Sequence, residues 1–80
     1  MLKTLDLLIP IFREVFDDDN LLINLSTTAN DIEGWDSLAN IRLVVAIEKF
    51  FKLRFSASEI SNLENVRDVV NLILKKQKNI

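Results

Sequence analysis

The residues of this chain that could do chemistry centre on one serine, Ser37, in the stretch Gly34-Trp35-Asp36-Ser37-Leu38. A nucleophilic serine needs a nearby base and a group that orients that base. The chain has no histidine and no cysteine. Lys49 lies roughly three helical turns beyond Ser37, which is too far for a serine–lysine pair. We therefore expect no catalytic residue in the chain and expect Ser37 to accept a group from another enzyme.

The residues before Ser37 favour a helix start at this point. Asp36 is a typical N-cap, whose carboxylate accepts from the N–H groups of Leu38 or Ala39. Asp and Ser at a helix start need no function. The end of a helix nevertheless offers free N–H groups and a positive dipole, which favour a phosphate on Ser37. Gly34 frees the backbone here, and we interpret Trp35 as a packing anchor.

Helical periodicity predicts a first helix from about residue 2 to residue 16, with Pro10 on its polar side, where we expect a bend. The acidic run 17–19 opposes the helix dipole and should end the helix. It lacks the alternating ligands of a calcium loop, and we expect no metal site. The apolar face of this helix consists of Leu5, Leu8, Ile9, Phe12, Val15 and Phe16.

A segment without clear period follows from residue 17 to residue 36. Loops of this length are uncommon in compact domains unless they are functional or held by their own apolar side chains. We expect a long loop, with room for one short helical turn. The residues that could hold it on the core are Leu21, Leu22, Ile23, Leu25 and Ile32.

The helix predicted from Ser37 to about Phe51 has two apolar faces. At about 100° per residue, its core face comprises Leu43, Val44, Ala46, Ile47, Phe50 and Phe51. Asn40 falls within this face, so we expect it to find a buried hydrogen-bond partner such as loop backbone. The second face is the docking stripe Leu38, Ile41 and Val45, which is flanked by Arg42 and Lys49 on one side and by Ser37 and Glu48 on the other. Either the long loop covers this stripe or a partner protein binds it.

The last third of the chain predicts a connector, a short helix and a final helix. Residues 52–55 are too few for an element, and Ser56-Ala57-Ser58-Glu59 is typical of a capping box that opens a helix to about Leu63. Asn65 should cap the last helix, with Asp68 in its first turn. Its buried face comprises Val66, Val69, Val70 and Ile73. We therefore predict an all-α fold, a small bundle of three main helices and one short helix.

Length and composition limit the function further. Eighty residues predict a single domain, 1–80, and a net charge of −2 without a clustered basic face argues against nucleic acid. No apolar run is long enough to enter and cross a bilayer, and the first residues do not resemble a signal peptide. The absence of cysteine fits a reducing cytoplasm. We expect a monomeric cytoplasmic protein.

Several stretches together resemble the acyl carrier protein family. The resemblance is carried by Asp36-Ser37-Leu38, by residues 43–51 (LVVAIEKFF), by residues 55–60 (FSASEI) and by residues 66–70 (VRDVV). It covers essentially the whole chain. Asp-Ser-Leu alone is a weak signal, but at the head of this helix and in a domain of this length it is a strong one.

The resemblance implies a four-helix carrier domain whose Ser37 receives a 4′-phosphopantetheine arm from coenzyme A. It implies a separate phosphopantetheinyl transferase that uses magnesium, with Asp36 helping to bind that enzyme and its metal. The thiol of the arm would carry an acyl cargo as a thioester between loading and transfer enzymes. Partner contacts would fall on Leu38, Ile41, Arg42, Val45 and Glu48.

The chain departs from the fatty-acid-synthesis carriers that it resembles. Ala39 and Arg42 stand where acidic residues are frequent in that group. We therefore expect a free-standing carrier of a specialised pathway, such as polyketide-like, amino-acid or polysaccharide modification. Two alternatives stay open, an aminoacyl or peptidyl carrier and a helical adaptor without a prosthetic group. In the adaptor, Ser37 would be only part of a helix cap.

Overall fold

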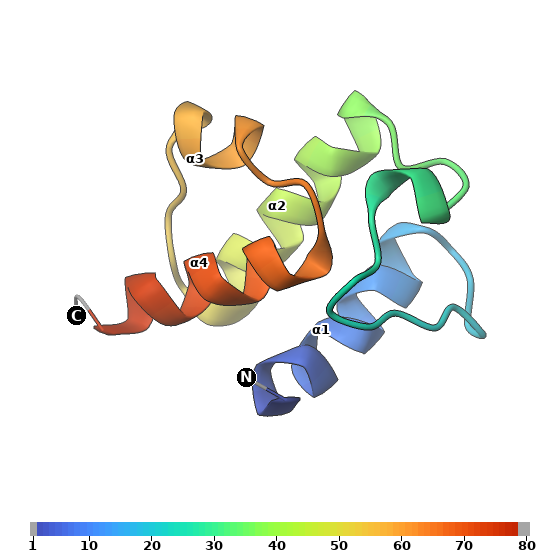
Figure 1. Ribbon diagram of the computed structural model, residues 1–80, viewed down its shortest axis with the longest axis horizontal. Coiled ribbons are helices and arrows are strands. Elements are labelled where there is room, and N and C mark those ends of the chain that lie inside the picture. The colour runs from blue at the N-terminus through green and yellow to red at the C-terminus, as the bar shows by residue number, and fades with distance from the viewer. Residues whose placement is uncertain (1, 79–80) are drawn as a thin grey trace.

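The computed structural model describes residues 2–78, which fold into four α-helices and one 3₁₀ turn (Figure 1). The elements are α1 (Leu2–Val15), η1 (Ala29–Asp31), α2 (Ser37–Phe51), α3 (Ala57–Ser61) and α4 (Val66–Lys78). Within the described residues no strand forms, and a single antiparallel bridge joins Thr28 to Asn65. The predicted all-α fold, with three main helices and one short helix, is confirmed.

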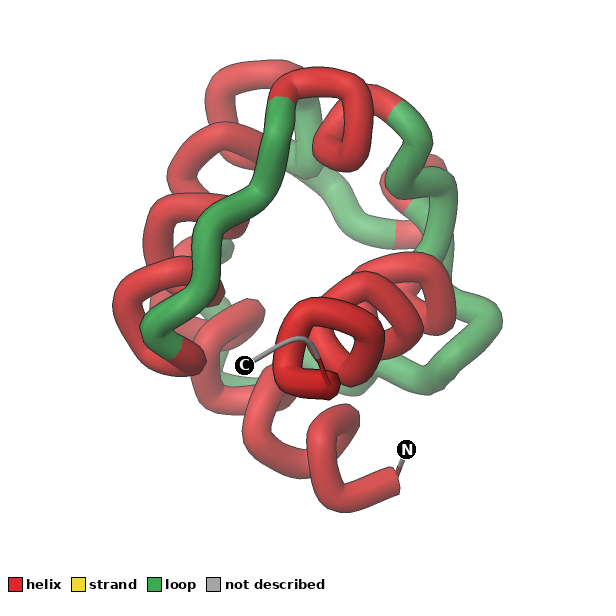
Figure 2. Tube along the Cα trace, turned by 90° about the vertical axis from the view of Figure 1, so that its left-hand side faces the viewer, coloured by secondary structure: helices red, strands yellow, loops and turns green. Residues whose placement is uncertain are grey.

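The core forms where the apolar faces of α1, α2 and α4 meet, and Figure 2 shows these helices wrapped around one interior. Phe12 and Leu8 come from α1, and Leu43 and Ile47 come from α2. The side of α4 that faces them is the predicted one. Its fully buried side chains are Val66, Val69, Val70 and Ile73. Nearly the whole core is thus supplied by residues at helical spacing.

The end of α1 shows how the acidic run works. Pro10 lies inside the helix on its exposed side, as predicted. Asp17 adopts a left-handed backbone with φ of 51°, and the Asp18 N–H donates to the Arg13 carbonyl at 3.0 Å. The left-handed backbone at Asp17 lets the Asp18 N–H reach the Arg13 carbonyl in the last turn. The helix therefore ends at Val15, one residue earlier than predicted.

The long loop is fixed to the start of α4. The Val66 N–H donates to the Thr27 carbonyl at 2.9 Å, and the Arg67 N–H donates to the Leu25 carbonyl at 3.0 Å. The Asn65 side-chain oxygen accepts from the Asp68 N–H at 2.9 Å, which confirms Asn65 as the cap. The free N–H groups at the start of α4 therefore hold the loop in place. The loop also contains the predicted short turn, η1.

Four of the five apolar side chains expected to hold the loop do so. Ile23 and Ile32 are buried, and Leu21 and Leu25 pack against the core. Leu22 is 80% exposed, so this part of the prediction is wrong. The backbone around Leu22 is outside any helix, and neighbouring side chains in extended chain point in opposite directions. With Leu21 and Ile23 turned inward, Leu22 faces solvent.

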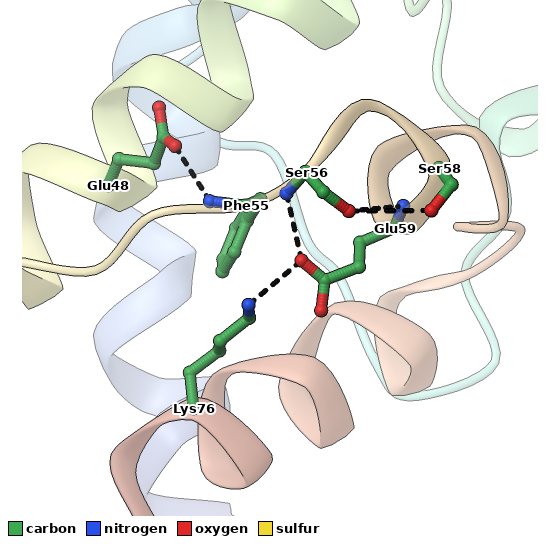
Figure 3. A network of polar contacts seen from close by, with 6 residues as sticks. All are labelled: Glu48, Phe55, Ser56, Ser58, Glu59 and Lys76. Atoms are coloured by element: carbon green, nitrogen blue, oxygen red, sulfur yellow. Dashed lines mark hydrogen bonds and ion pairs between the residues drawn. The ribbon is translucent and has the colours of Figure 1, made fainter. Parts of the chain in front are cut away.

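Polar contacts hold α3 against α4 and the connector before α3 against α2 (Figure 3). Ser56 and Glu59 form the predicted capping box, and the Glu59 carboxylate pairs with Lys76 of α4 at 2.9 Å. The Ser56 backbone N–H, followed by Lys76, lowers the pKa of Glu59 from 4.5 to about 2. α3 ends at Ser61 instead of Leu63, because a turn closed by the Leu63 N–H and the Ile60 carbonyl follows it.

Candidate functional site

The loop that leads into α2 turns sharply at Gly34. Gly34 has φ of 87°, a conformation that residues with a Cβ rarely adopt, and the Asp36 N–H donates back to the Gly34 carbonyl at 2.9 Å. A Cβ at Gly34 would meet nothing within 4 Å, so the backbone angle, not space, requires glycine. Buried Ile32 fixes the other side of the turn. The turn thereby sets where α2 begins.

Trp35 anchors this turn on the core, as predicted. Its ring lies edge-on to Phe12, with ring centres 5.5 Å apart, and also contacts Phe16. The indole Nε1–H donates to Asn40 Oδ1 at 3.1 Å. Asn40 therefore has the hydrogen-bond partner that was expected, and this partner is the Trp35 side chain instead of loop backbone. The bond joins the turn to the first helical turns of α2.

Asp36 caps α2 as predicted, with its carboxylate accepting from the Ala39 N–H at 2.8 Å. Ser37 follows as the first helical residue and is exposed. Within residues 2–78 the structure gives no hydrogen-bond partner to the Ser37 hydroxyl or to the backbone N–H groups of Ser37 and Leu38. Exposed N–H groups and the positive helix end together suit a phosphate oxygen beside this hydroxyl.

An open hollow of about 300 Å³ lies beside the serine. Its lining combines the turn and the start of α2 with two segments that are distant in sequence, and consists of Ala29, Trp35, Asp36, Ser37, Asn40 and Leu63. A phosphate ester on Ser37 would thus have solvent access and space next to its attachment point. Sequence reasoning did not identify Ala29 and Leu63, because no pattern connects them with Ser37.

The docking stripe is open to solvent. Leu38 is 60% exposed, Ile41 59% and Val45 41%. The long loop therefore does not cover the stripe, and the structure favours partner binding between the two alternatives. Arg42 beside it is also exposed.

Phe50 and Glu48 of α2 have surroundings that helical spacing did not predict. Phe50 was predicted in the core but is 54% exposed; it lies in the last turn of α2, where its ring packs edge-on against Phe51 with ring centres 5.0 Å apart. Glu48 is half-buried, and its carboxylate accepts from the Phe55 N–H at 2.9 Å (Figure 3). This bond fixes the connector after α2. Glu48 therefore has a structural role, and it lies beside the docking stripe.

Residues 2–78 contain neither a carboxylate metal site nor a membrane-spanning helix. No group of three or more Asp or Glu side chains could hold a metal ion in this part of the chain. None of its helices combines the length and the apolar character needed to cross a membrane.

Comparison with known proteins relates this geometry to one family. The family model described as "Phosphopantetheine attachment site" matches residues 6–73. An acyl carrier protein of Cyanidium caldarium is 42% identical over 50 residues, which are 62% of this chain and 57% of that relative. The chain thus spans less than two thirds of that relative's length. An acyl carrier protein of Onion yellows phytoplasma (strain OY-M) is 35% identical over 57 residues, which are 71% of this chain and 75% of that relative.

Two solved structures share the fold. The solution structure of a holo acyl carrier protein from Geobacter metallireducens superposes with a TM-score of 0.88 and 46% sequence identity, covering 95% of this chain and 87% of that one. The crystal structure of an acyl carrier protein from Thermotoga maritima gives a TM-score of 0.84 and 28% identity, with 96% and 89% covered.

Proposed function

We propose that Ser37 is the residue to which 4′-phosphopantetheine is attached. This chain belongs to the acyl carrier protein family, and its domain carries that group covalently. The observation that carries this proposal is the place of the Ser37 hydroxyl. Ser37 is exposed, and its hydroxyl forms no hydrogen bond within residues 2–78. It also stands at the positive end of α2, next to an open hollow.

The neighbouring residues prepare Ser37 without activating it. The Asp36 carboxylate accepts from the Ala39 N–H. The N–H groups of Ser37 and Leu38 can therefore donate to a phosphate. The Asp36 carboxylate is exposed, so it is accessible to a transferase and its metal. A phosphorus–oxygen bond to the Ser37 hydroxyl oxygen forms as the pyrophosphate link of coenzyme A breaks, and adenosine 3′,5′-bisphosphate leaves with the bridging oxygen. The serine proton then has to leave to a base of the transferase, because the chain has no histidine.

The arm, when bound, supplies a thiol that holds an acyl group as a thioester. The chain itself contributes position and recognition. We propose that loading and transfer enzymes bind the docking stripe Leu38, Ile41 and Val45, with Arg42 and Glu48 at its rim. These apolar side chains lead away from Ser37 along α2 and have the mix of apolar centre and charged edge that is typical of transient interfaces.

We further propose service in a specialised pathway in the cytoplasm, with one monomeric carrier domain in residues 1–80. Support comes from the charge of α2, since Ala39 and Arg42 stand where acids are frequent and leave Glu48 as the one carboxylate of this helix for enzymes with basic patches to recognise. The pathway would be one whose enzymes do not require an acidic carrier.

Incubation with coenzyme A and a broad-specificity phosphopantetheinyl transferase tests the assignment of Ser37. We expect the intact mass to rise by one 4′-phosphopantetheine group. The Ser37→Ala variant should gain nothing, because it lacks the acceptor oxygen. Electrospray mass spectrometry of the intact protein gives both results directly.

Ser26→Ala is the matched control, because Ser26 is an exposed serine of the loop whose side chain makes no hydrogen bond within residues 2–78. It should be modified as completely as the original chain. A mass gain on Ser37→Ala, or an unmodified original chain across several transferases, would contradict the proposal.

A further inference from the structure

A groove of about 610 Å³ lies between α1 and α2, on the side of the docking stripe. Its apolar lining includes Ile11 of α1 together with Ile41, Val45 and Phe50 of α2. Phe50, which contributes little to the core, is 54% exposed here. The stripe is therefore one wall of a larger apolar surface whose other wall is α1. An apolar side chain from a partner would be covered on two sides in this groove.

The charge around this groove is mainly positive. Arg42 and Lys49 both line it, and both are exposed. Glu14 is the carboxylate on the opposite wall. The structure records no ion pair of Arg42 or Lys49 with a carboxylate of residues 2–78. Their charges are thus available to a partner instead of being neutralised within the fold.

The positive charge continues beyond the groove. Lys49 and Val45 also line a second open hollow of about 540 Å³, which holds Lys52 and Arg54. Glu48 lies in that hollow too, but its carboxylate is bonded to the Phe55 N–H. The C-terminal half of α2 thus presents an apolar surface between exposed cations.

Helix electrostatics alone does not explain this arrangement. A lysine in the last turn is stabilised by the helix dipole, which accounts for Lys49. Arg42 lies in the middle of α2, where the dipole has little effect. Both cations nevertheless border the same exposed apolar groove, on the side that a partner would approach.

We infer, resting on the proposed carrier function, that the enzymes serving this carrier insert an apolar side chain flanked by carboxylates into the groove between α1 and α2. The apolar side chain contacts Ile41, Val45 and Phe50. The carboxylates pair with Arg42 and Lys49, which fixes the orientation of the carrier on the partner. The partner surface is acidic, and charge complementarity makes binding fall as salt concentration rises.

Two synthetic helical peptides with blocked ends test this inference. They share one leucine face, which is flanked by glutamates in the first peptide and by lysines in the second. Each is titrated into the isotope-labelled chain, and amide chemical shifts are followed by NMR. We expect the glutamate peptide to bind at least about tenfold more tightly at low salt. The largest shifts should fall on Ile41, Val45, Lys49 and Phe50.

Matched charge variants assign the preference to the groove. Arg42→Glu/Lys49→Glu should abolish or reverse the preference for the glutamate peptide. Lys75→Glu/Lys78→Glu lowers the net charge by the same amount at two exposed residues of α4 and should keep the preference. All four positions are exposed, and circular dichroism checks that both variants are folded.

Several outcomes would overturn the inference. These are equal or tighter binding of the lysine peptide, no binding of either peptide, shifts centred away from the groove, and equal losses in the two double variants. The titration is made before and after loading with coenzyme A and transferase. A chain that is never loaded contradicts the role of Ser37, while the peptide result is read from the groove alone.

Discussion

Asp36 caps α2, and we propose that the same side chain has a second role in recognition by the transferase. The Asp36 carboxylate accepts the Ala39 N–H and so ends the turn and starts α2. The same carboxylate is exposed beside Ser37, where it can meet a transferase and its metal. A stability measurement and a loading measurement on the same variants can separate these roles, because an amide can replace the cap but not the charge.

We expect Asp36→Ala to lower the free energy of unfolding by about 1 kcal/mol, since the Ala39 N–H loses its cap. Asp36→Asn should leave stability nearly unchanged, because Asn is an equally good N-cap. Both variants should be loaded more slowly by the transferase. Urea unfolding and timed mass spectra measure the two effects. Fast loading of Asp36→Asn would show that the charge has no role.

At the residue scale, prediction from sequence depended on how local the interaction was. Asp36 and Asn65 were identified as caps because a capping side chain and the N–H group that donates to it lie within one turn of helix. The bond between Trp35 and Asn40 was missed. Its donor lies in an irregular turn, and no periodicity gives the direction of a side chain there. The exposure of Leu22 was missed for the same reason.

Among the elements, α3 is the shortest and depends most on polar contacts. Five residues cannot form a stable helix alone. α3 is held by its capping box and by the ion pair of Glu59 with Lys76 on α4 (Figure 3). The ion pair needs the ionised form of Glu59, and the carboxylate also accepts more strongly from the Ser56 N–H when it is ionised, so the packing of α3 should depend on pH.

The pKa of Glu59 is lowered in the folded chain from 4.5 to about 2. A lowered folded pKa means that the ionised group adds stability above pH 4.5, and that this contribution is lost as pH falls toward 2. We expect Glu59→Gln to be less stable than the original chain at neutral pH and to lose less stability on acidification over this range.

Urea unfolding at a series of pH values measures this difference. Glu64→Gln, at an exposed carboxylate just before α4, is the control and should follow the original curve. Identical pH curves for Glu59→Gln and the original chain would contradict the assigned role of Glu59. Added salt should reduce the difference, because both partners of the ion pair are partly exposed.

The faces of α2 could be predicted only in part. Spacing identified the exposed stripe Leu38, Ile41 and Val45 and most of the core face. Spacing did not decide between loop cover and an open stripe, because that depends on where the loop packs. Phe50 was assigned to the core because its helical angle is close to that of buried Leu43, but it lies in the last turn of α2, and angle alone does not tell whether a neighbouring element covers that turn.

For the whole molecule, the helices and their order followed from periodicity and caps. The arrangement around Ser37 did not. The hollow beside it needs Ala29 and Leu63, and the groove needs Ile11 of α1 beside Ile41 of α2. These pairs are distant in sequence and meet only because the loop is fixed to α4 and because α1 packs on α2. Fixing the loop also places Gly34 and Trp35 where they can position the start of α2.

We propose that this fold presents Ser37 for modification by a separate enzyme. Mass spectrometry of the protein purified from its native cell tests it most directly, at the level of both intact chain and peptides. We predict one 4′-phosphopantetheine group per chain, with or without an acyl cargo. The peptide data should locate this group on Ser37. An unmodified Ser37 throughout the purified protein, or the group on any other residue, would contradict the claim.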